Sequence, residues 1–225
     1  MKEIIQNGLE NAPDLFGETE LESAKLKILT AAIEVFESKG FAGARMQEIA
    51  EKAEVNKALI HYYFKNKEGL YLEVLDLISG TFWRLVESID ASHLKNGAEF
   101  IDHLVGGFFA LLIANPSCKN LLLKELAQGG PFLKCLPEES AQNCDRKFVS
   151  MIQSVERLMD LGWLKKSDPM HLIFNIEALV MGSFVTAPFA ENGITHPIEL
   201  NQDFYTQRAL SVATLLKEGV LGDNN

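Results

Sequence analysis

Basic and aromatic side chains are concentrated in one short stretch of an otherwise acidic chain. Residues 55–71, VNKALIHYYFKNKEGLY, hold three lysines and five ring side chains. Lysine ammonium groups and tyrosine hydroxyls bind phosphate oxygens, and small side chains let a helix approach base edges closely. A histidine ring can donate to either group or accept from it. These residue types indicate contact with a nucleic acid.

The charge distribution favours the same interpretation. The 225-residue chain has a formal net charge of −10, yet residues 38–67 contain six cations and three carboxylates, a net charge of +3 that leaves −13 for the remainder. A local basic island is expected when only one part of a protein approaches a polyanion, whereas a protein that coats nucleic acid indiscriminately is basic overall. A solvated lysine-bearing surface would give the same pattern, so the motif around the island has to decide.

Helical periodicity predicts how these side chains are positioned. Apolar residues recur with helical spacing between residues 29 and 36, which predicts a first helix over residues 20–39. Thr19 and Glu22 fit a capping box at its start, and Gly40 fits a left-handed stop at its end. Short helices are expected over residues 46–53 and 57–64, the second with Asn56 as its N-cap. Two short helices joined by a tight turn form a helix-turn-helix, whose second helix enters the major groove of DNA.

The rest of the chain is also predicted to be helical. A long helix is expected from Lys67 to about residue 90, and further helices over residues 97–114, 117–127, 139–162, 169–190 and 202–219. Asp168 and Pro169 fit an N-cap followed by a proline at the first helical position. No alternating pattern of strand length is present in the sequence. The predicted fold class is therefore all-α, with about nine helices in all.

Patterns typical of catalysis, metal binding and membrane insertion are absent from the sequence. There is no G-x-S-x-G, no glycine-rich phosphate loop and no H-E-x-x-H, and the five histidines are scattered. The three cysteines match no C-x-x-C spacing, so reduced thiols are expected. The longest uncharged run, residues 103–118, is shorter than the roughly 18 to 20 residues of a membrane crossing. We expect no catalytic residues, no cofactor, no metal, no membrane association and a cytoplasmic location.

Residues 40–71, GFAGARMQEIAEKAEVNKALIHYYFKNKEGLY, resemble the DNA-binding domain of the TetR family of bacterial transcriptional regulators. The resemblance rests on the glycine-aromatic turn, the I-A pair of the second helix, a recognition helix ending in a Y-x-Y-F type of cluster, and the K-x-x-L that opens the fourth helix. With the first helix it covers residues 20–75. The chain departs from the family pattern where Ala44 and Arg45 replace a Thr or Ser, Glu54 replaces a turn glycine, and His61 replaces a tyrosine.

The resemblance implies that the helix-turn-helix binds duplex DNA. Matched position by position, six residues would face base edges or the adjacent backbone: Gln47, Lys57, Ala58, Leu59, His61 and Tyr63. Three more would hold phosphates: Arg45, Tyr62 and Lys67. A helix histidine among aromatic residues can instead be simply packed or solvent-facing. If the turn still requires a positive φ at Glu54, the cost is about 1 kcal/mol.

The resemblance also implies a division into three parts. These are an irregular N-terminal extension over residues 1–19, a helix-turn-helix DNA-binding domain over 20–67 with a connecting helix to about 90, and a ligand-binding and dimerisation domain over 68–225. Candidate ligand-binding residues combine aromatic, methionine and polar groups, with core packing as the alternative for each: Phe82, Trp83, His103, Phe108, Phe109, Met151, Trp163, Phe174, Glu177 and Met181. The effector itself is an unknown small molecule.

A homodimer is the expected assembly. A four-helix interface would use residues 172–185 and 202–219, with small or apolar contacts from Ala178, Gly182, Ser183, Phe204, Leu210, Ala213 and Leu216. The implied function is a ligand-responsive regulator, most often a repressor, that binds a pseudo-palindromic operator and is released by its effector. The alternative is a helical binding or adaptor protein that retains the helix-turn-helix only as a scaffold, and a DNA mobility-shift experiment would separate the two.

Overall fold

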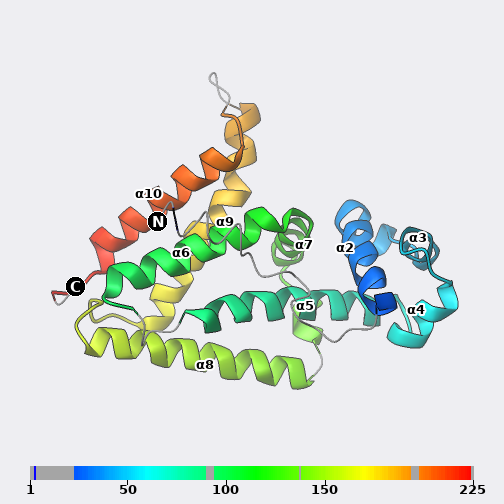
Figure 1. The fold of residues 1–225 in the computed structure, drawn as a ribbon, viewed down its shortest axis with the longest axis horizontal. Helices are drawn as coiled ribbons and strands as arrows, with labels where there is room; N and C mark the ends of the chain where they lie inside the picture. The colour runs from blue at the N-terminus through cyan, green and yellow to red at the C-terminus, as the bar shows by residue number, and fades with distance from the viewer. Residues whose placement is uncertain (1–2, 4–22, 90–93, 137, 194–197, 224–225) are drawn as a thin grey trace. The chain divides into compact units, whose positions relative to one another are not determined.

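The computed structural model describes residue 3 and residues 23–89, 94–136, 138–193 and 198–223. Over these residues the chain forms α-helices and one 3-10 turn (Figure 1): α2 (Ser23–Gly43), α3 (Met46–Lys52), α4 (Lys57–Phe64), α5 (Lys67–Ser88), α6 (Gly97–Ala114), α7 (Pro116–Ala127), η1 (Leu133–Cys135), α8 (Glu138–Asp160), α9 (Pro169–Gly193) and α10 (Gln202–Val220). The only β-type pairing in this part of the chain is an isolated bridge between Leu164 and Leu221. The predicted all-α fold is confirmed.

The helices begin and end within about four residues of the bounds predicted from the sequence, and α2 continues to Gly43 where an end at residue 39 was expected. The side chain of Asn56 accepts a hydrogen bond from the Ala58 amide at 2.9 Å, which caps α4. Asp168 caps α9 in the same way, accepting from the Met170 amide at 2.8 Å. Gly40, with φ 67°, interrupts α2 where a left-handed stop was expected. The capping box predicted at Thr19 and Glu22 lies outside the described residues.

The chain divides into two compact units that interleave along the sequence. One consists of residues 13–81 and 115–144, and the other of residues 1–12, 82–114 and 145–225. Helices α5 and α8 each contribute to both units. The functional division at residue 67 remains a prediction, because it concerns which part binds DNA and which part binds ligand, and the extension over residues 1–19 lies almost wholly outside the described residues.

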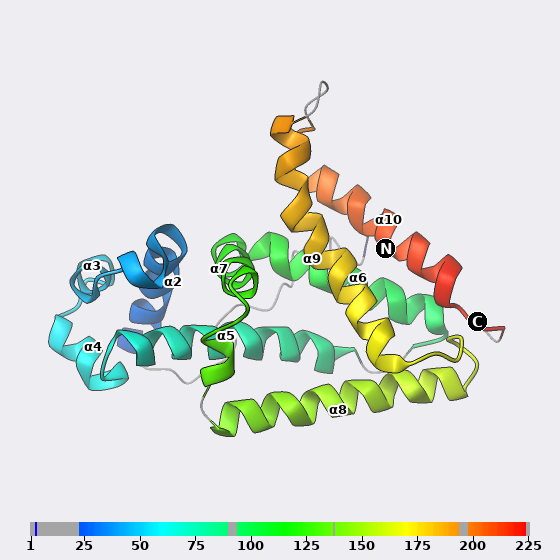
Figure 2. The ribbon, with the colours of Figure 1, turned by 180° about the vertical axis from the view of Figure 1, so that it is seen from behind.

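The first unit has a core built by five helices, in which α2 packs against both α3 and α7. In Figures 1 and 2, α2, α3 and α4 lie together at the first turns of α5. The core side chains with no more than 1% exposure include Ile28, Leu29, Phe36, Ile49, Ile60, Leu70 and Leu121. Each such aliphatic or aromatic side chain contributes roughly 1.5–3 kcal/mol by leaving water. This burial fixes the short helices of the helix-turn-helix.

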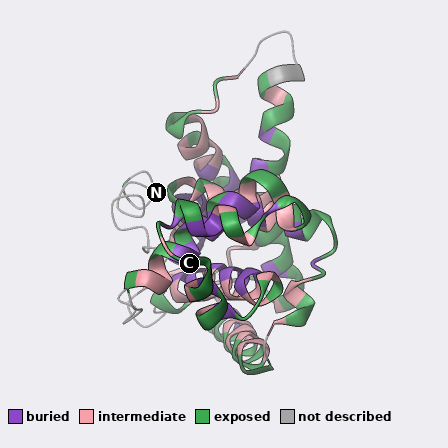
Figure 3. Cartoon of the chain, turned by 90° about the vertical axis from the view of Figure 1, so that its right-hand side faces the viewer, coloured by how far each residue is buried: buried purple, intermediate pink, exposed green. Residues whose placement is uncertain are grey.

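In the second unit, α6 packs along α10, and both helices contact α9. Asp102 of α6 and Lys217 of α10 form an ion pair with 2.6 Å between oxygen and nitrogen. A Cβ on Gly107 would lie 2.7 Å from a methyl group of Leu85, so the glycine permits close packing there. Figure 3 colours buried residues purple. The buried face of α6 includes Phe100, Ile101, Leu104, Val105, Phe108 and Phe109.

By length and composition, α6 and α9 are both apolar enough to cross a membrane, with mean hydropathies of 1.5 and 1.6. The sequence expectation of no membrane crossing rested on the length of the longest uncharged run. Helix α6 is a core helix, because 56% of its apolar window is buried and its Asp102 forms an ion pair with Lys217 of α10. Only 33% of the α9 window is buried. Much of the apolar surface of α9 is therefore exposed.

Candidate nucleic-acid interface

Helix α4 has one anchored face and one exposed face. Ile60 and Phe64 are 0% and 5% exposed and hold the helix in the core, as the sequence pattern predicted. The opposite face carries Lys57, Ala58, His61 and Tyr62, and all four are exposed, Tyr62 by 79%. Positions i, i+1, i+4 and i+5 share one side of a helix. This face offers cations, rings and a small residue to a groove.

Two residues predicted to face bases also contribute to packing. Leu59 and Tyr63 are partly buried and pack against the core of the helix-turn-helix. The ring of Tyr63 contacts the rings of Tyr62 at 5.3 Å and Phe64 at 6.0 Å between centroids. Both side chains therefore help to position α4. A direct contact of either with bases remains a prediction.

The start of α3 presents Arg45 and Gln47. Arg45 is the N-cap residue, with extended backbone angles and no side-chain capping bond, as expected for an arginine at this position. Its exposed guanidinium is able to form a bidentate contact with a phosphate. Gln47 is also exposed, and its amide donates to the Glu51 carboxylate at 3.0 Å. A base contact by Gln47 would have to replace or share that bond.

The turn between α3 and α4 has a positive φ at Glu54, the position where this chain lacks the family's turn glycine. Glu54 has φ 55°, in the region that glycine adopts most easily. The Val55 amide donates to the Ala50 carbonyl at 3.0 Å, which closes the turn at the end of α3. The predicted positive φ is therefore confirmed, at a cost of about 1 kcal/mol.

Contacts within the fold occupy half of the cations in the basic island. Lys39 pairs with Glu48 at 2.5 Å, and Lys52 pairs with Glu34 at 2.6 Å. Lys67 donates to backbone carbonyls at the end of α2 and in its connection to α3. The other three have no ion pair or side-chain hydrogen bond to the described residues: Arg45, Lys57 and Lys65. Lys65 was not among the DNA contacts predicted from the sequence.

The ring of His61 is fixed by the end of its own helix. Its Nδ1 lies 2.8 Å from the Lys65 carbonyl oxygen, and because that oxygen can only accept, Nδ1 carries the proton. Lys65 follows α4 with φ 62°, and its amide donates back to the His61 carbonyl at 3.0 Å. Nε2 is therefore the ring atom of His61 that remains for a contact with DNA.

Most of the candidate ligand-binding residues pack against other aromatic rings. Phe82 stacks on Phe108 with 5.0 Å between centroids and contacts Trp83 edge-on at the same distance. Phe109, fully buried, contacts Phe184 instead, at 5.3 Å. Met151, Trp163 and Met181 are half-buried, whereas Phe174 and Glu177 are exposed on α9. Among these candidates, ring contacts join Phe82, Trp83 and Phe108 into one aromatic group.

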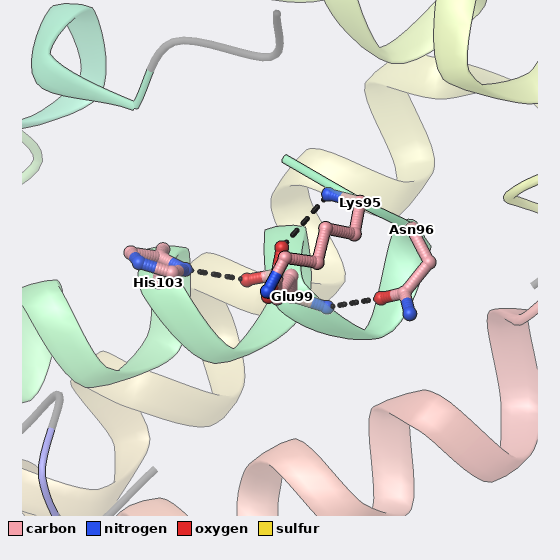
Figure 4. Close-up of polar contacts among 4 residues, drawn as sticks. All are labelled: Lys95, Asn96, Glu99 and His103. Atoms are coloured by element: carbon pink, nitrogen blue, oxygen red, sulfur yellow. Dashed lines mark hydrogen bonds and ion pairs between the residues drawn. The ribbon is translucent and has the colours of Figure 1, made fainter. Parts of the chain in front are cut away.

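His103 and Glu177 are the polar members of that candidate set. Figure 4 shows His103 donating from Nδ1 to the Glu99 carbonyl at 2.8 Å, one turn before it on α6. In the same view Asn96 accepts from the Glu99 amide, and the Glu99 carboxylate accepts from the Lys95 amide, which together cap α6. Glu177 as a whole is exposed, but its carboxyl is partly desolvated by neighbouring atoms, which raises its pKa above the ordinary value.

The predicted dimer residues fall into two groups. Ser183, Ala213 and Leu216 are buried within the protomer, and Ser183 accepts a hydrogen bond from Arg208 of α10 at 3.0 Å. These three side chains are therefore largely covered within one protomer, and their part in a dimer interface remains a prediction. Gly182, Phe204 and Leu210 are half-buried, and Ala178 is exposed. Large apolar side chains that sequence reasoning missed are exposed on α9 instead: Met170, Val185 and Phe189.

The helix-turn-helix and the exposed face of α4 define a DNA-binding protein of the all-α regulatory class. The family model described as bacterial regulatory proteins, tetR family, matches residues 28–74. The transcriptional regulator RutR of Escherichia coli K12 is 30% identical over 208 residues, which cover 88% of this chain and 91% of RutR. The chain therefore belongs to the TetR family of bacterial transcriptional regulators.

One further relative is similar in sequence, and one solved structure is similar in fold. The transcriptional repressor NicS of Pseudomonas putida is 44% identical over 103 residues, 45% of this chain and 48% of NicS. The crystal structure of the regulator FadR from Bacillus subtilis in complex with stearoyl-CoA matches with a TM-score of 0.64 and 20% identity, over 86% of this chain and 98% of FadR. These relatives are transcriptional regulators, not enzymes.

Proposed function

We propose that the chain is a ligand-responsive transcriptional repressor, which binds a pseudo-palindromic operator as a homodimer and is released by a small molecule. The observation that carries the DNA-binding part is the exposed face of α4, held in place by the buried Ile60 and Phe64. In support of repression, NicS is a repressor with 44% identity over the matched part. In support of a ligand, the FadR structure contains stearoyl-CoA.

The apolar stripe along α9 supports a homodimer. Its members recur every three or four residues and so share one side of the helix: Met170, Phe174, Ala178, Met181, Val185 and Phe189. Phe174 is 52% exposed and Phe189 is 75% exposed. A stripe of this length needs a covering surface, and a two-fold axis lets a second copy cover it with the same residues. The dimer would present two α4 helices to half-sites about one DNA turn apart.

The ligand would bind within the unit that contains α6, α9 and α10. Half-buried residues that combine ring, thioether and imidazole groups suit a small, mostly apolar molecule: Phe82, His103, Met151 and Met181. A ligand releases DNA only if it binds one conformation of the dimer more tightly than the other. In that case the spacing of the two α4 helices would differ between the free and liganded dimers.

Selection from a random duplex library tests DNA recognition. Rounds of binding to the purified protein should enrich a sequence with two-fold symmetry, because each protomer reads one half-site. Lys57→Ala and Gln47→Ala should alter the enriched bases as well as the affinity, whereas Lys166→Ala, an exposed lysine on the loop before α9, should change neither. Failure to enrich any sequence would favour the adaptor function.

Sedimentation of interface variants tests the dimer. Phe174→Glu and Phe189→Glu place charges on the α9 stripe and should convert the dimer to monomers. Val149→Glu, at an apolar residue of α8 that is 51% exposed, is the matched control and should leave the dimer intact. A wild-type protein that sediments as a monomer at micromolar concentration would contradict the assignment. A thermal-shift screen of small molecules then searches for the effector.

A further inference from the structure

The ammonium group of Lys67 is fully occupied within the fold. Its Nζ donates to the carbonyl oxygens of Phe41 at 2.7 Å, Ala44 at 3.1 Å and Ala42 at 3.3 Å. It also lies 4.6 Å from the centroid of the Phe41 ring, within the range of a cation–π contact. A lysine ammonium has three N–H donors. None remains for a phosphate while this arrangement persists.

Two of the three carbonyls, those of Phe41 and Ala42, lie in the last residues of α2, and the third, that of Ala44, lies in the connection to α3. They follow the break at Gly40 and precede Arg45, the N-cap residue of α3. The last carbonyls of a helix lack partners within it and are stabilised by a cation at that end. Lys67, in the first turn of α5, therefore ties two parts of the chain that are 23 to 26 residues apart.

Aromatic packing fixes the same segment from the other side of Phe41. The Phe41 ring lies 4.5 Å from the Phe132 ring, 5.2 Å from the Tyr71 ring and 6.3 Å from the Phe36 ring, measured between centroids. Phe36 is fully buried and Tyr71 is 4% exposed. The group of carbonyls around Lys67 thus cannot shift toward solvent without disturbing the core.

The corner between α4 and α5 is equally tight, and it leaves Lys65 exposed. The Asn66 side chain caps α5 by accepting from the Gly69 amide at 2.7 Å. A Cβ on Gly69 would lie 2.4 Å from the Phe64 carbonyl oxygen, so the two helix ends are in direct backbone contact. Lys65 lies between them with φ 62°, and its exposed side chain has no ion pair with the described residues.

We propose that Lys67 is a positioning residue of the helix-turn-helix, and that Lys65 makes the phosphate contact at this corner. This assignment replaces the phosphate contact that the family resemblance implied for Lys67, and it rests on the proposed binding to DNA. Lys67 holds the end of α2 and its connection to α3, and with it Arg45 and α3, on the connecting helix α5. Lys65 supplies the cation that contacts a DNA phosphate.

The salt dependence of DNA binding tests the two roles. The magnitude of the slope of log affinity against log salt falls by about 0.9 for each phosphate that the protein no longer neutralises, so by about 1.8 for a two-fold dimer. Lys65→Gln should lower the slope by this amount and leave the melting temperature unchanged. Lys67→Met should lower affinity by a constant factor at every salt concentration with the slope unchanged. Lys52→Gln, which removes a lysine already paired with Glu34, is the control and should keep the slope.

The melting temperature of Lys67→Arg provides a second test, which depends on the geometry of the cationic group. This substitution keeps the charge, but a planar guanidinium cannot direct three donors to carbonyls arranged around an ammonium. The melting temperature should therefore fall in Lys67→Arg as it does in Lys67→Met, while Lys65→Arg should keep both stability and slope. If Lys67→Met fails to fold, two other measurements test the assignment: the salt slope of Lys65→Gln and the melting temperature of Lys67→Arg.

A different pattern would overturn the proposal. It would be wrong if Lys67→Arg melts like the wild type, or if Lys67→Met reduces the slope while Lys65→Gln does not. The duplex enriched by selection is the first probe, and a mixed-sequence duplex at low salt is the second. If no sequence is enriched, the proposed operator binding fails, yet slopes on the mixed-sequence duplex still test the two lysines, because they report phosphate contacts alone.

Discussion

The buried carboxylate of Glu125 offers a sharp test of how the helix-turn-helix is supported. Glu125 is 2% exposed at the end of α7. One carboxylate oxygen accepts from the amides of Phe132 at 2.6 Å and Leu133 at 3.3 Å, and the other accepts from the Tyr71 hydroxyl at 3.3 Å. Burial and the charge of Glu125 raise the pKa of Tyr71, so its hydroxyl remains a donor. Glu125→Ala leaves all three donors without an acceptor.

The magnitude follows from these three hydrogen bonds. An orphaned buried donor costs about 1–3 kcal/mol. Two of the bonds are long and both amides belong to half-buried residues, so we take values near the lower limit and expect a loss of about 3 kcal/mol. For a chain of this size that lowers the melting temperature by roughly 6–12 °C. Because Phe132 and Tyr71 pack on Phe41, DNA affinity should fall as well.

Glu125→Gln is the matched variant. Its amide oxygen can accept from both backbone amides, and its NH2 group can donate to the Tyr71 hydroxyl oxygen, so the network is kept without a buried charge. We expect a loss below about 1 kcal/mol, since removing the cost of burying a charge offsets weaker hydrogen bonds. Urea unfolding measures both variants. Equal stability of Glu125→Ala and Glu125→Gln would refute the role given to the three bonds.

Three further predictions concern local backbone and charge. Gly69→Ala should lower the free energy of unfolding by about 1–3 kcal/mol, because its Cβ meets a backbone oxygen at 2.4 Å; an unchanged urea midpoint would contradict this close approach. Glu54→Gly should raise stability by about 0.5–1 kcal/mol by relieving the positive φ. For Glu177, an exposed residue whose pKa is raised by partial desolvation of its carboxyl, the protonated form is favoured in the fold, so stability should fall as pH rises from the ordinary glutamate pKa through the raised value. Across that pH range, the melting temperature of Glu177→Gln should change less than that of the wild type.

The features that the sequence predicted well depend on local interactions. The predicted helix over residues 57–64 is α4, and the one over 97–114 is α6, because caps and apolar periodicity act within a few residues. Asn56 and Asp168 cap the helices that they were expected to cap. The 3-10 turn at Leu133–Cys135 was not predicted, since three residues are too few for a periodic signal.

Long-range contacts account for what the sequence did not predict. Nothing in the side-chain pattern indicates that Lys67 bonds carbonyls more than 20 residues earlier, because backbone oxygens have no residue-type signal. Similarly, Ala213 and Leu216 were expected at a dimer interface, and they are buried by neighbouring helices of the same protomer. An apolar face indicates that something covers it, but periodicity does not identify the covering surface.

Pairing within the fold also limits how the protein can bind DNA. Three of the six cations of the basic island are occupied, and the three without partners among the described residues are Arg45, Lys57 and Lys65. A two-fold dimer could then neutralise about six phosphates, for a salt slope near −5, about half the value if all the cations took part. The net charge of −13 outside the island repels DNA further. In the proposed mode of binding, discrimination between sites would therefore depend on base-edge contacts from α3 and α4, because phosphate contacts alone would hold the dimer weakly at physiological salt.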